Sequence, residues 1–136
     1  MRVADLRVEL QAEVDGHRDT LFPLVSTADG LQRWIDEATL DPRVGGGFRF
    51  RLLDGVATGR VLAIEPVQHI SYSWDWEGQP LGVATTVAFD LIAHGSRTHL
   101  TLRHVGFRRR SQVELHDALW RYWFPRLTAA ARVTSA

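Results

Sequence analysis

The chain has 136 residues with sixteen basic and sixteen acidic side chains, so its formal net charge is zero. This length is typical of one domain that buries its own core, and we expect residues 1–136 to form a single domain. The neutral balance argues against a general attraction to nucleic acid or to anionic membranes. The absence of cysteine excludes disulfides, thiolate nucleophiles and cysteine-ligated metals.

The N-terminal stretch MRVADLRVELQAEVDG lacks the apolar core of a signal peptide. No apolar run approaches the roughly 20 residues of a membrane-spanning helix. We therefore expect a cytoplasmic protein without a membrane span. Every basic residue is arginine, and neither lysine nor asparagine occurs, which indicates a GC-rich and therefore bacterial genome.

The first predicted element is a strand. Apolar residues occupy every second position from 8 to 14, which is typical of a strand with one buried face. The segment 15–35 predicts two short helices. Pro23 disturbs the first of them, and Thr27 is a suitable N-cap for the second.

The middle of the chain has the period of two that is typical of strands, and Asp54-Gly55 indicates a hairpin turn. The predicted strands lie at 37–41, 48–53, 56–66, 69–76, 83–92 and 98–107. Within 69–76, four large apolar residues alternate with polar ones. This alternation does not distinguish a filled core from the wall of a cavity.

The last segment, 111–133, has the period of a long amphipathic helix. We expect Ser111 to cap its start and Pro125 to bend it. The whole order is one strand, two short helices, about six strands and one long helix. Since a single antiparallel sheet must bury one apolar face, it should curl around this helix and form an α+β domain.

Several short motifs follow one another in a fixed order along nearly the whole chain. They are Trp34, DPRVGGGFRF at 41–50, DG at 54–55, GRVLAIEP at 59–66, ISYSW at 70–74, THLTLRHVGF at 98–107, and Trp120, Phe124 and Leu127. This ordered set resembles the family around the C-terminal domain of the heat-shock-protein-90 ATPase activator, within the START-like or SRPBCC superfamily.

The resemblance implies the helix-grip fold, a curved antiparallel sheet of about seven strands around a long C-terminal helix, with two short helices after the first strand. It also implies a place in the stress response. The wider superfamily binds lipids, polyketides and other apolar molecules.

Our first hypothesis is that the domain binds a small apolar or aromatic molecule between the sheet and the C-terminal helix, without a cofactor. His104 shares a strand face with Leu100 and Leu102 and would be a polar anchor in this cavity. The expected cavity residues are Trp34, Phe48, Phe50, Tyr72, Trp74, Val87, Phe89, His104, His116, Trp120 and Phe124. A structural role for His104, hydrogen bonded to the backbone or to a neighbouring hydroxyl, is the simpler interpretation.

Two alternatives come from other classes of protein. The domain could be a chaperone-associated interaction module whose surface binds a chaperone partner. It could also be a polyketide cyclase-like or dehydratase-like enzyme in which His104 is a general acid or base, with Tyr72 or His116 within reach. We disfavour an enzyme and assign no catalytic residue, because no nucleophile motif is present.

Two further motifs support no separate function. The six histidines have no metal-ligand spacing, so we expect no metal site. The run RRR at 108–110 precedes the last helix. We interpret it as a solvated loop rather than a nucleic-acid patch, because the chain is neutral overall and no aromatic-basic surface accompanies it.

Overall fold

The computed structural model describes residues 6–53 and 55–135. Seven antiparallel strands form one sheet in the order β1-β7-β6-β5-β4-β3-β2. The strands are β1 (Val8–Asp15), β2 (Glu37–Leu40), β3 (Gly47–Leu52), β4 (Gly55–Glu65), β5 (His69–Trp76), β6 (Thr85–His94) and β7 (Arg97–Val105). Because β7 pairs with both β1 and β6, the first strand joins the sheet beside the last one.

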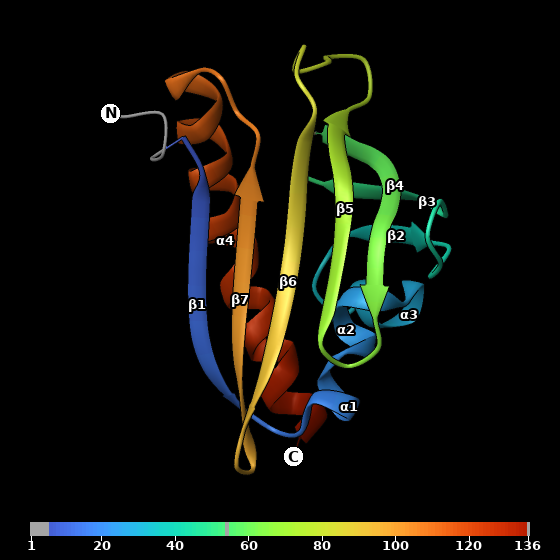
Figure 1. The fold of residues 1–136 in the computed structure, drawn as a ribbon, viewed down its shortest axis with the longest axis vertical. Helices are drawn as coiled ribbons and strands as arrows, with labels where there is room; N and C mark the ends of the chain where they lie inside the picture. The colour runs from blue at the N-terminus through green and yellow to red at the C-terminus, as the bar shows by residue number, and fades with distance from the viewer. Residues whose placement is uncertain (1–5, 54, 136) are drawn as a thin grey trace.

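All the helices lie on one side of this sheet (Figure 1). They are α1 (Arg18–Leu21), α2 (Pro23–Ser26), α3 (Ala28–Leu31) and the long α4 (Arg110–Ser135). Figure 1 shows α4 behind β1, β7 and β6, α2 and α3 behind the β4–β5 side of the sheet, and α1 below the β4–β5 hairpin. The predicted α+β helix-grip fold is confirmed, with three single-turn helices after β1 in place of the two expected.

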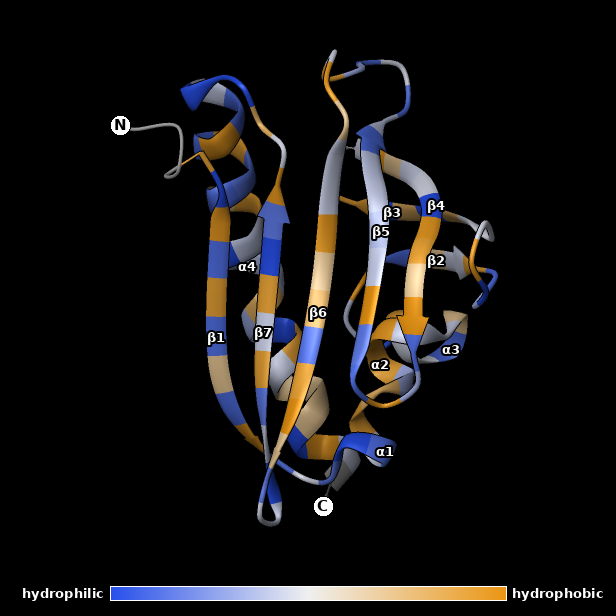
Figure 2. Ribbon diagram, viewed as in Figure 1, coloured by the Kyte–Doolittle hydropathy of each residue, from blue (hydrophilic) through white to orange (hydrophobic). Residues whose placement is uncertain are grey.

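Alternation along the strands explains why the sheet has one buried face. In β3 the side chains of Phe48, Phe50 and Leu52 are buried, and those between them are exposed. Figure 2 shows the same alternation of hydrophobic and hydrophilic residues along β1 and β7. Since successive strand residues point to opposite faces, this pattern directs the apolar set toward the helices.

The short helices follow from local chemistry. Pro23 is the first residue of α2, where its missing N–H is not needed, so it begins a helix rather than disturbing one. The Thr27 hydroxyl accepts a hydrogen bond from the Gly30 N–H at 3.0 Å, which confirms the predicted N-cap of α3. A Cβ on Gly30 would lie 1.9 Å from the Pro23 carbonyl oxygen, so α2 and α3 pack at a distance that only glycine permits.

The predicted cap of the last helix was wrong, and part of the predicted turn at 54–55 lies outside the described residues. The helix α4 begins at Arg110, so Ser111 lies inside its first turn and is not its cap. It continues without a break past Pro125. Asp54 of the predicted turn lies outside the described residues, although Leu52 and Gly55 pair across the hairpin. None of the helices in the described part of the chain is long and apolar enough to cross a membrane.

Candidate functional site

The side chains expected to line a cavity all lie in the interior and contact one another. Trp74 of β5 lies at the centre of this cluster, and its ring centroid is 5.2 Å from that of Trp120 on α4. The rings of Phe48 and Phe50 lie 6.0 and 6.2 Å from Trp74. Phe89 of β6 lies 6.4 Å from Trp120. The sheet and the helix therefore meet ring against ring.

This packing fills the space that the sequence suggested for a ligand. Each of the eleven residues named for that space has at most 6% of its surface exposed. A void of about 10 Å³ lies toward the other end of α4, among Leu21, Leu24, Leu91, Leu100 and Leu127. This is about the space of one water molecule, whereas small-molecule sites commonly measure about 300–1,000 Å³. A ligand would enter the aromatic cluster only if rings moved.

His104 is held in one neutral form by its neighbours. The Thr85 hydroxyl donates to the Trp74 carbonyl at 2.7 Å, so its oxygen accepts from His104 Nε2 at 3.0 Å. His104 Nδ1 then accepts from the Trp120 indole N–H at 3.0 Å. Burial holds the pKa of His104 well below its ordinary value, and the neighbouring His116 lowers it further. Both ring nitrogens are thus occupied, as the structural interpretation requires.

His116 of α4 has a matching arrangement. Its Nδ1 donates to the Gln112 carbonyl at 2.7 Å, and its Nε2 accepts from the Trp76 indole N–H at 2.9 Å. Burial lowers the pKa of His116, although the hydrogen bond to Gln112 opposes this shift. The His104 and His116 rings lie 4.9 Å apart, and the Phe107 ring covers both at 4.4 and 4.8 Å. Two histidines and two tryptophans therefore form one polar cluster, in which Trp76 is partly exposed and the other three side chains are buried.

Tyr72 lies in a different part of the interior. Its hydroxyl donates to the Val25 carbonyl of α2, and the Trp34 indole donates to the Leu24 carbonyl at 2.8 Å. Burial raises the pKa of Tyr72 above its usual range. The Tyr72 hydrogen bond thus joins α2 to the sheet, and the Trp34 hydrogen bond joins the segment after α3 to α2. Thr85 rather than Tyr72 is the hydroxyl partner of His104.

Two interior indole groups have no hydrogen-bond partner among the residues that the structure describes. These are the N–H groups of Trp74 and Trp123, and the side-chain carbonyl of Gln112 is likewise unpaired. An unpaired buried donor costs about 1–3 kcal/mol. The Trp74 N–H bears more directly on ligand binding, because its ring lies at the centre of the aromatic cluster. An acceptor oxygen of a ligand beside this N–H would remove the cost of the unpaired donor.

The opposite face of the sheet is charged. Arg103 of β7 bridges Glu9 on β1 at 2.9 Å and Asp90 on β6 at 3.2 Å. Asp90 also holds Nδ1 of His69 at 2.8 Å. Within residues 6–53 and 55–135, no group of three or more histidine, aspartate or glutamate side chains is arranged to hold a metal ion. The polar side chains of this face therefore form cross-strand pairs between carboxylates and arginine or histidine.

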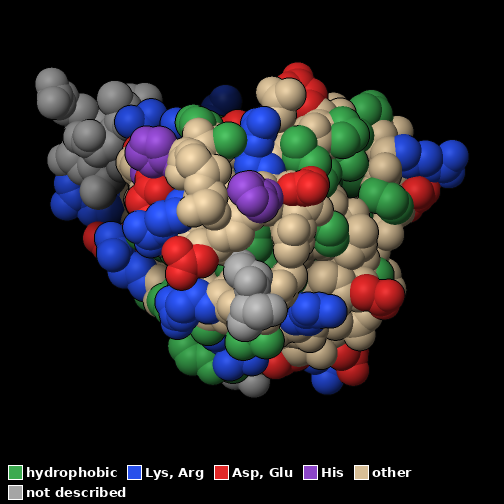
Figure 3. All heavy atoms as spheres, turned by 90° about the horizontal axis from the view of Figure 1, so that it is seen from below, with side chains coloured by type: hydrophobic (Ala, Val, Ile, Leu, Met, Phe, Trp, Pro, Cys, Tyr) green, Lys and Arg blue, Asp and Glu red, His purple; other side chains and the backbone are tan. Residues whose placement is uncertain are grey.

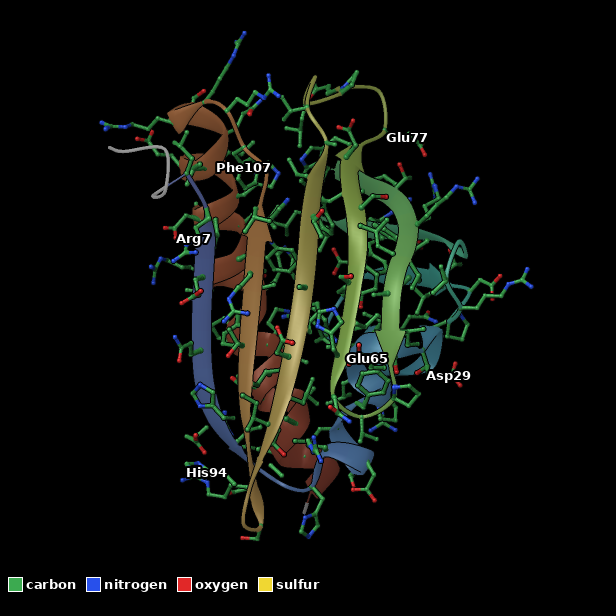
Figure 4. The ribbon with its side chains drawn as sticks, in the orientation of Figure 1. Arg7, Asp29, Glu65, Glu77, His94 and Phe107 are labelled. Carbon is green, nitrogen blue, oxygen red and sulfur yellow. The ribbon has the colours of Figure 1, made fainter. Side chains whose placement is uncertain are left out.

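An open groove, which the sequence did not indicate, lies at the end of the molecule where β7 stops and α4 starts. Its volume is about 800 Å³. Three segments line it: Leu6 and Arg7 before β1, residues 82–84 before β6, and residues 105–108 after β7. Figure 4 shows Arg7 and Phe107 at this end. The segments are far apart in the sequence, so only the sheet order brings them together.

Comparison with known proteins identifies relatives of this architecture. The family model for "Activator of Hsp90 ATPase homolog 1-like protein" matches residues 15–132. The activator of 90 kDa heat shock protein ATPase homolog 1 of Mus musculus is 24% identical over 107 residues, which are 78% of this chain and 31% of that protein. The chain thus spans about a third of the length of this curated relative.

Solved structures support the same fold. Protein MLL2253 from Mesorhizobium loti superposes with a TM-score of 0.80 and 25% identity, covering 91% of this chain and 95% of that one. The solution structure of the Aha1 dimer from Colwellia psychrerythraea superposes with a TM-score of 0.78 over 96% of this chain and 98% of that one. At 18% identity, the second likeness shows the fold alone.

Proposed function

Because the chain belongs to the activator of Hsp90 ATPase homolog 1-like family, we propose that it is an interaction module whose partner is the ATPase of an Hsp90-type chaperone. The observation that carries this proposal is the contact between Trp74 and Trp120 at 5.2 Å, in the middle of the space where a ligand would lie. Because the interior is packed with its own rings, the surface is the part of the domain that a partner can reach without a rearrangement. Since the chain spans about a third of its mouse relative, stimulation of ATP turnover is itself part of the proposal.

An ATPase assay tests the proposal directly. The chain is titrated into purified Hsp90-type chaperones, one bacterial and one eukaryotic, and ATP turnover is followed beside binding by sedimentation velocity. We expect saturable binding and a rise in turnover with at least one of them. The variant Trp120→Phe, which changes only the interior, should bind as the parent does. Absence of binding to both chaperones would remove the proposal.

A second candidate is binding of a small apolar molecule in the interior, and the unpaired indole N–H of Trp74 favours it. A molecule with an aromatic body and one acceptor oxygen would pack against the rings and satisfy this donor. The rings would have to separate to admit it. The residues of this proposed site are Trp34, Phe48, Phe50, Tyr72, Trp74, Val87, Phe89, His104, His116, Trp120 and Phe124.

Tryptophan fluorescence during titration with flavonoids, polyketide-like aromatics and fatty acids tests this second candidate. The substitution Trp74→Phe keeps a ring in place but removes the donor, so it should weaken binding of an acceptor-bearing ligand by about fivefold to tenfold. Phe48→Leu is the matched control without a lost donor. If no compound gives a saturable titration, the second candidate is contradicted and only the chaperone proposal remains.

The cyclase-like alternative has less support from the geometry. Both ring nitrogens of His104 are occupied, by Trp120 and Thr85, and the lowered pKa keeps the ring neutral near neutral pH. A general acid must hold a proton that it can release, and a general base needs a free lone pair. His104 offers neither unless the network opens.

A further inference from the structure

We propose that the open groove at the start of α4 binds an extended, acidic segment of a partner polypeptide. The groove is the one lined by Leu6 and Arg7, residues 82–84 and residues 105–108, and we call it the arginine groove. The inference deepens the proposed function, because it names the surface that would hold the partner, and it rests on that function only for the identity of the partner.

The first support is an excess of positive charge. Arg7 and Arg108 line the groove, and Arg109 and Arg110 follow at the start of α4. All four are exposed, and none makes a salt bridge within the described part of the chain. The charge of Arg7 helps to lower the pKa of Glu9, but the main partner of that carboxylate is Arg103.

Of the eleven other arginines in the described part of the chain, six are neutralised. Salt bridges hold these six: Arg43, Arg49, Arg51, Arg97, Arg103 and Arg121. At the opposite end of the molecule, basic and acidic side chains are interspersed (Figure 3). Because the chain is neutral as a whole, four arginines at one groove, none of them in a salt bridge with a described residue, are a local excess of positive charge. The nearest acidic residue in the following turn of the helix is Glu114, which is also exposed.

The second support is the backbone around the groove. At this end the β6–β7 ladder stops at the pair of Thr86 with Val105, so both chain segments leave the sheet at this point. Gly106 has a φ of 101°, and a Cβ there would lie 2.5 Å from the Ala84 carbonyl oxygen. The two segments therefore approach closely with no side chain between them. Backbone groups beyond a strand end are suited to pair with an extended peptide.

The residues that line the arginine groove favour an acidic peptide over a nucleic acid. Val105 is 37% exposed, so the groove offers an apolar contact beside its guanidinium groups. Phe107, in contrast, is 5% exposed and packs on His104, so it offers no ring for a base to stack on. Guanidinium groups bind carboxylates through paired hydrogen bonds. These features favour carboxylates separated by small apolar side chains over a single-stranded nucleic acid.

A direct binding experiment tests the inference without a chaperone. Fluorescence anisotropy is measured with a labelled peptide of alternating glutamate and valine, with its glutamine counterpart, with a single-stranded oligonucleotide, and with inorganic phosphate as competitor. We expect saturable binding of the glutamate peptide that weakens as salt rises, and no saturable binding of the glutamine peptide. Stronger binding of the oligonucleotide, or full displacement by phosphate, would overturn the proposal.

Matched charge reversals locate the site. The double variant Arg7→Glu, Arg108→Glu should weaken the glutamate peptide about tenfold or more. The control, Arg33→Glu with Arg132→Glu, makes the same change in net charge at exposed positions. Neither of these two arginines is in a salt bridge within residues 6–53 and 55–135, and Arg33 reaches Thr134 near the far end of α4 at 3.2 Å. An equal loss in the control would show that net charge, and not the groove, binds the peptide.

The chaperone assay separates this inference from the proposed function. If the parent binds the glutamate peptide but no chaperone, the arginine groove stands and the proposed function fails. If the double variant of Arg7 and Arg108 binds and stimulates a chaperone as well as the parent does, the proposed function stands and the arginine groove is not its surface.

Discussion

Strand β7 carries one histidine on each face, and the two have different surroundings: one is buried among rings, and the other lies beside a carboxylate. His104, on the inner face, is fully buried between the Trp120 indole and the Thr85 hydroxyl. His99, on the outer face, contacts the Glu13 carboxylate at 2.7 Å and the Gln11 amide oxygen at 2.9 Å. The inner site selects a neutral ring, because Nδ1 of His104 must keep its lone pair to accept the hydrogen bond from the Trp120 indole. The outer site places a negative charge beside the ring.

The comparison extends to the groups around each histidine. On the inner face, every hydrogen bond of His104 is shielded from water by aromatic rings, of which Trp74 and Phe107 lie at 5.5 and 4.4 Å. On the outer face, His94 and His99 lower the pKa of the exposed Glu13 by hydrogen bonding to it. Buried polar groups depend on complete pairing, whereas exposed ones exchange partners with water. The inner face should therefore dominate stability.

The substitution with the largest expected effect is Trp120→Ala. It would remove a ring from the centre of the interior and leave Nδ1 of His104 without its donor. Truncation of a buried tryptophan reduces the free energy of unfolding by about 3–5 kcal/mol. Urea denaturation followed by circular dichroism measures the loss. Leu115→Ala, on the exposed side of the same helix, should stay within about 0.5 kcal/mol of the parent, and similar losses in the two variants would contradict the comparison.

Acid should weaken the inner face before it weakens the outer one. The pKa values of His104 and His116 in the folded chain lie below the ordinary 6.5. The unfolded chain therefore binds protons that the folded chain excludes, and the free energy of unfolding falls as pH drops below 6.5. The slope approaches at most about 1.4 kcal/mol per pH unit for each histidine.

Urea denaturation at a series of pH values between about 7.5 and 5.5 measures this slope. The double variant His104→Gln, His116→Gln should be less stable than the parent near neutral pH, but its stability should change less with pH. A slope that persists unchanged in this double variant would contradict its assignment to the two buried histidines.

The sequence was sufficient for the fold because strand alternation is a local property. The period of two placed Phe48, Phe50 and Leu52 on one face, and β3 buries these same residues. The helical period of the last segment likewise placed His116 and Trp120 toward the sheet. The ends of helices and strands were harder to predict, since the start of α4 at Arg110 depends on the path of the chain after β7.

The candidate site was harder to predict from the sequence. Alternation indicates which face of a strand a residue occupies, but not its distance from another residue. It placed His104 inside, but the distances to Trp120 and Thr85 depend on how far α4 lies from the sheet. It also could not say how much space the rings leave. The arginine groove depends on the sheet order, which sets Arg7, just before the first strand, beside Arg108, just after the last strand.

The smallest expected effect comes from the outer face. Arg103 bridges Glu9 and Asp90, but its side chain is 46% exposed, so water and salt screen both pairs. Arg103→Gln should therefore reduce the free energy of unfolding by only about 0.2–1 kcal/mol at low salt. Because ions screen exposed pairs, urea denaturation in about 1 M sodium chloride should bring variant and parent together. A loss in high salt as large as that of Trp120→Ala would mean that the charged face, and not the aromatic interior, holds the sheet together.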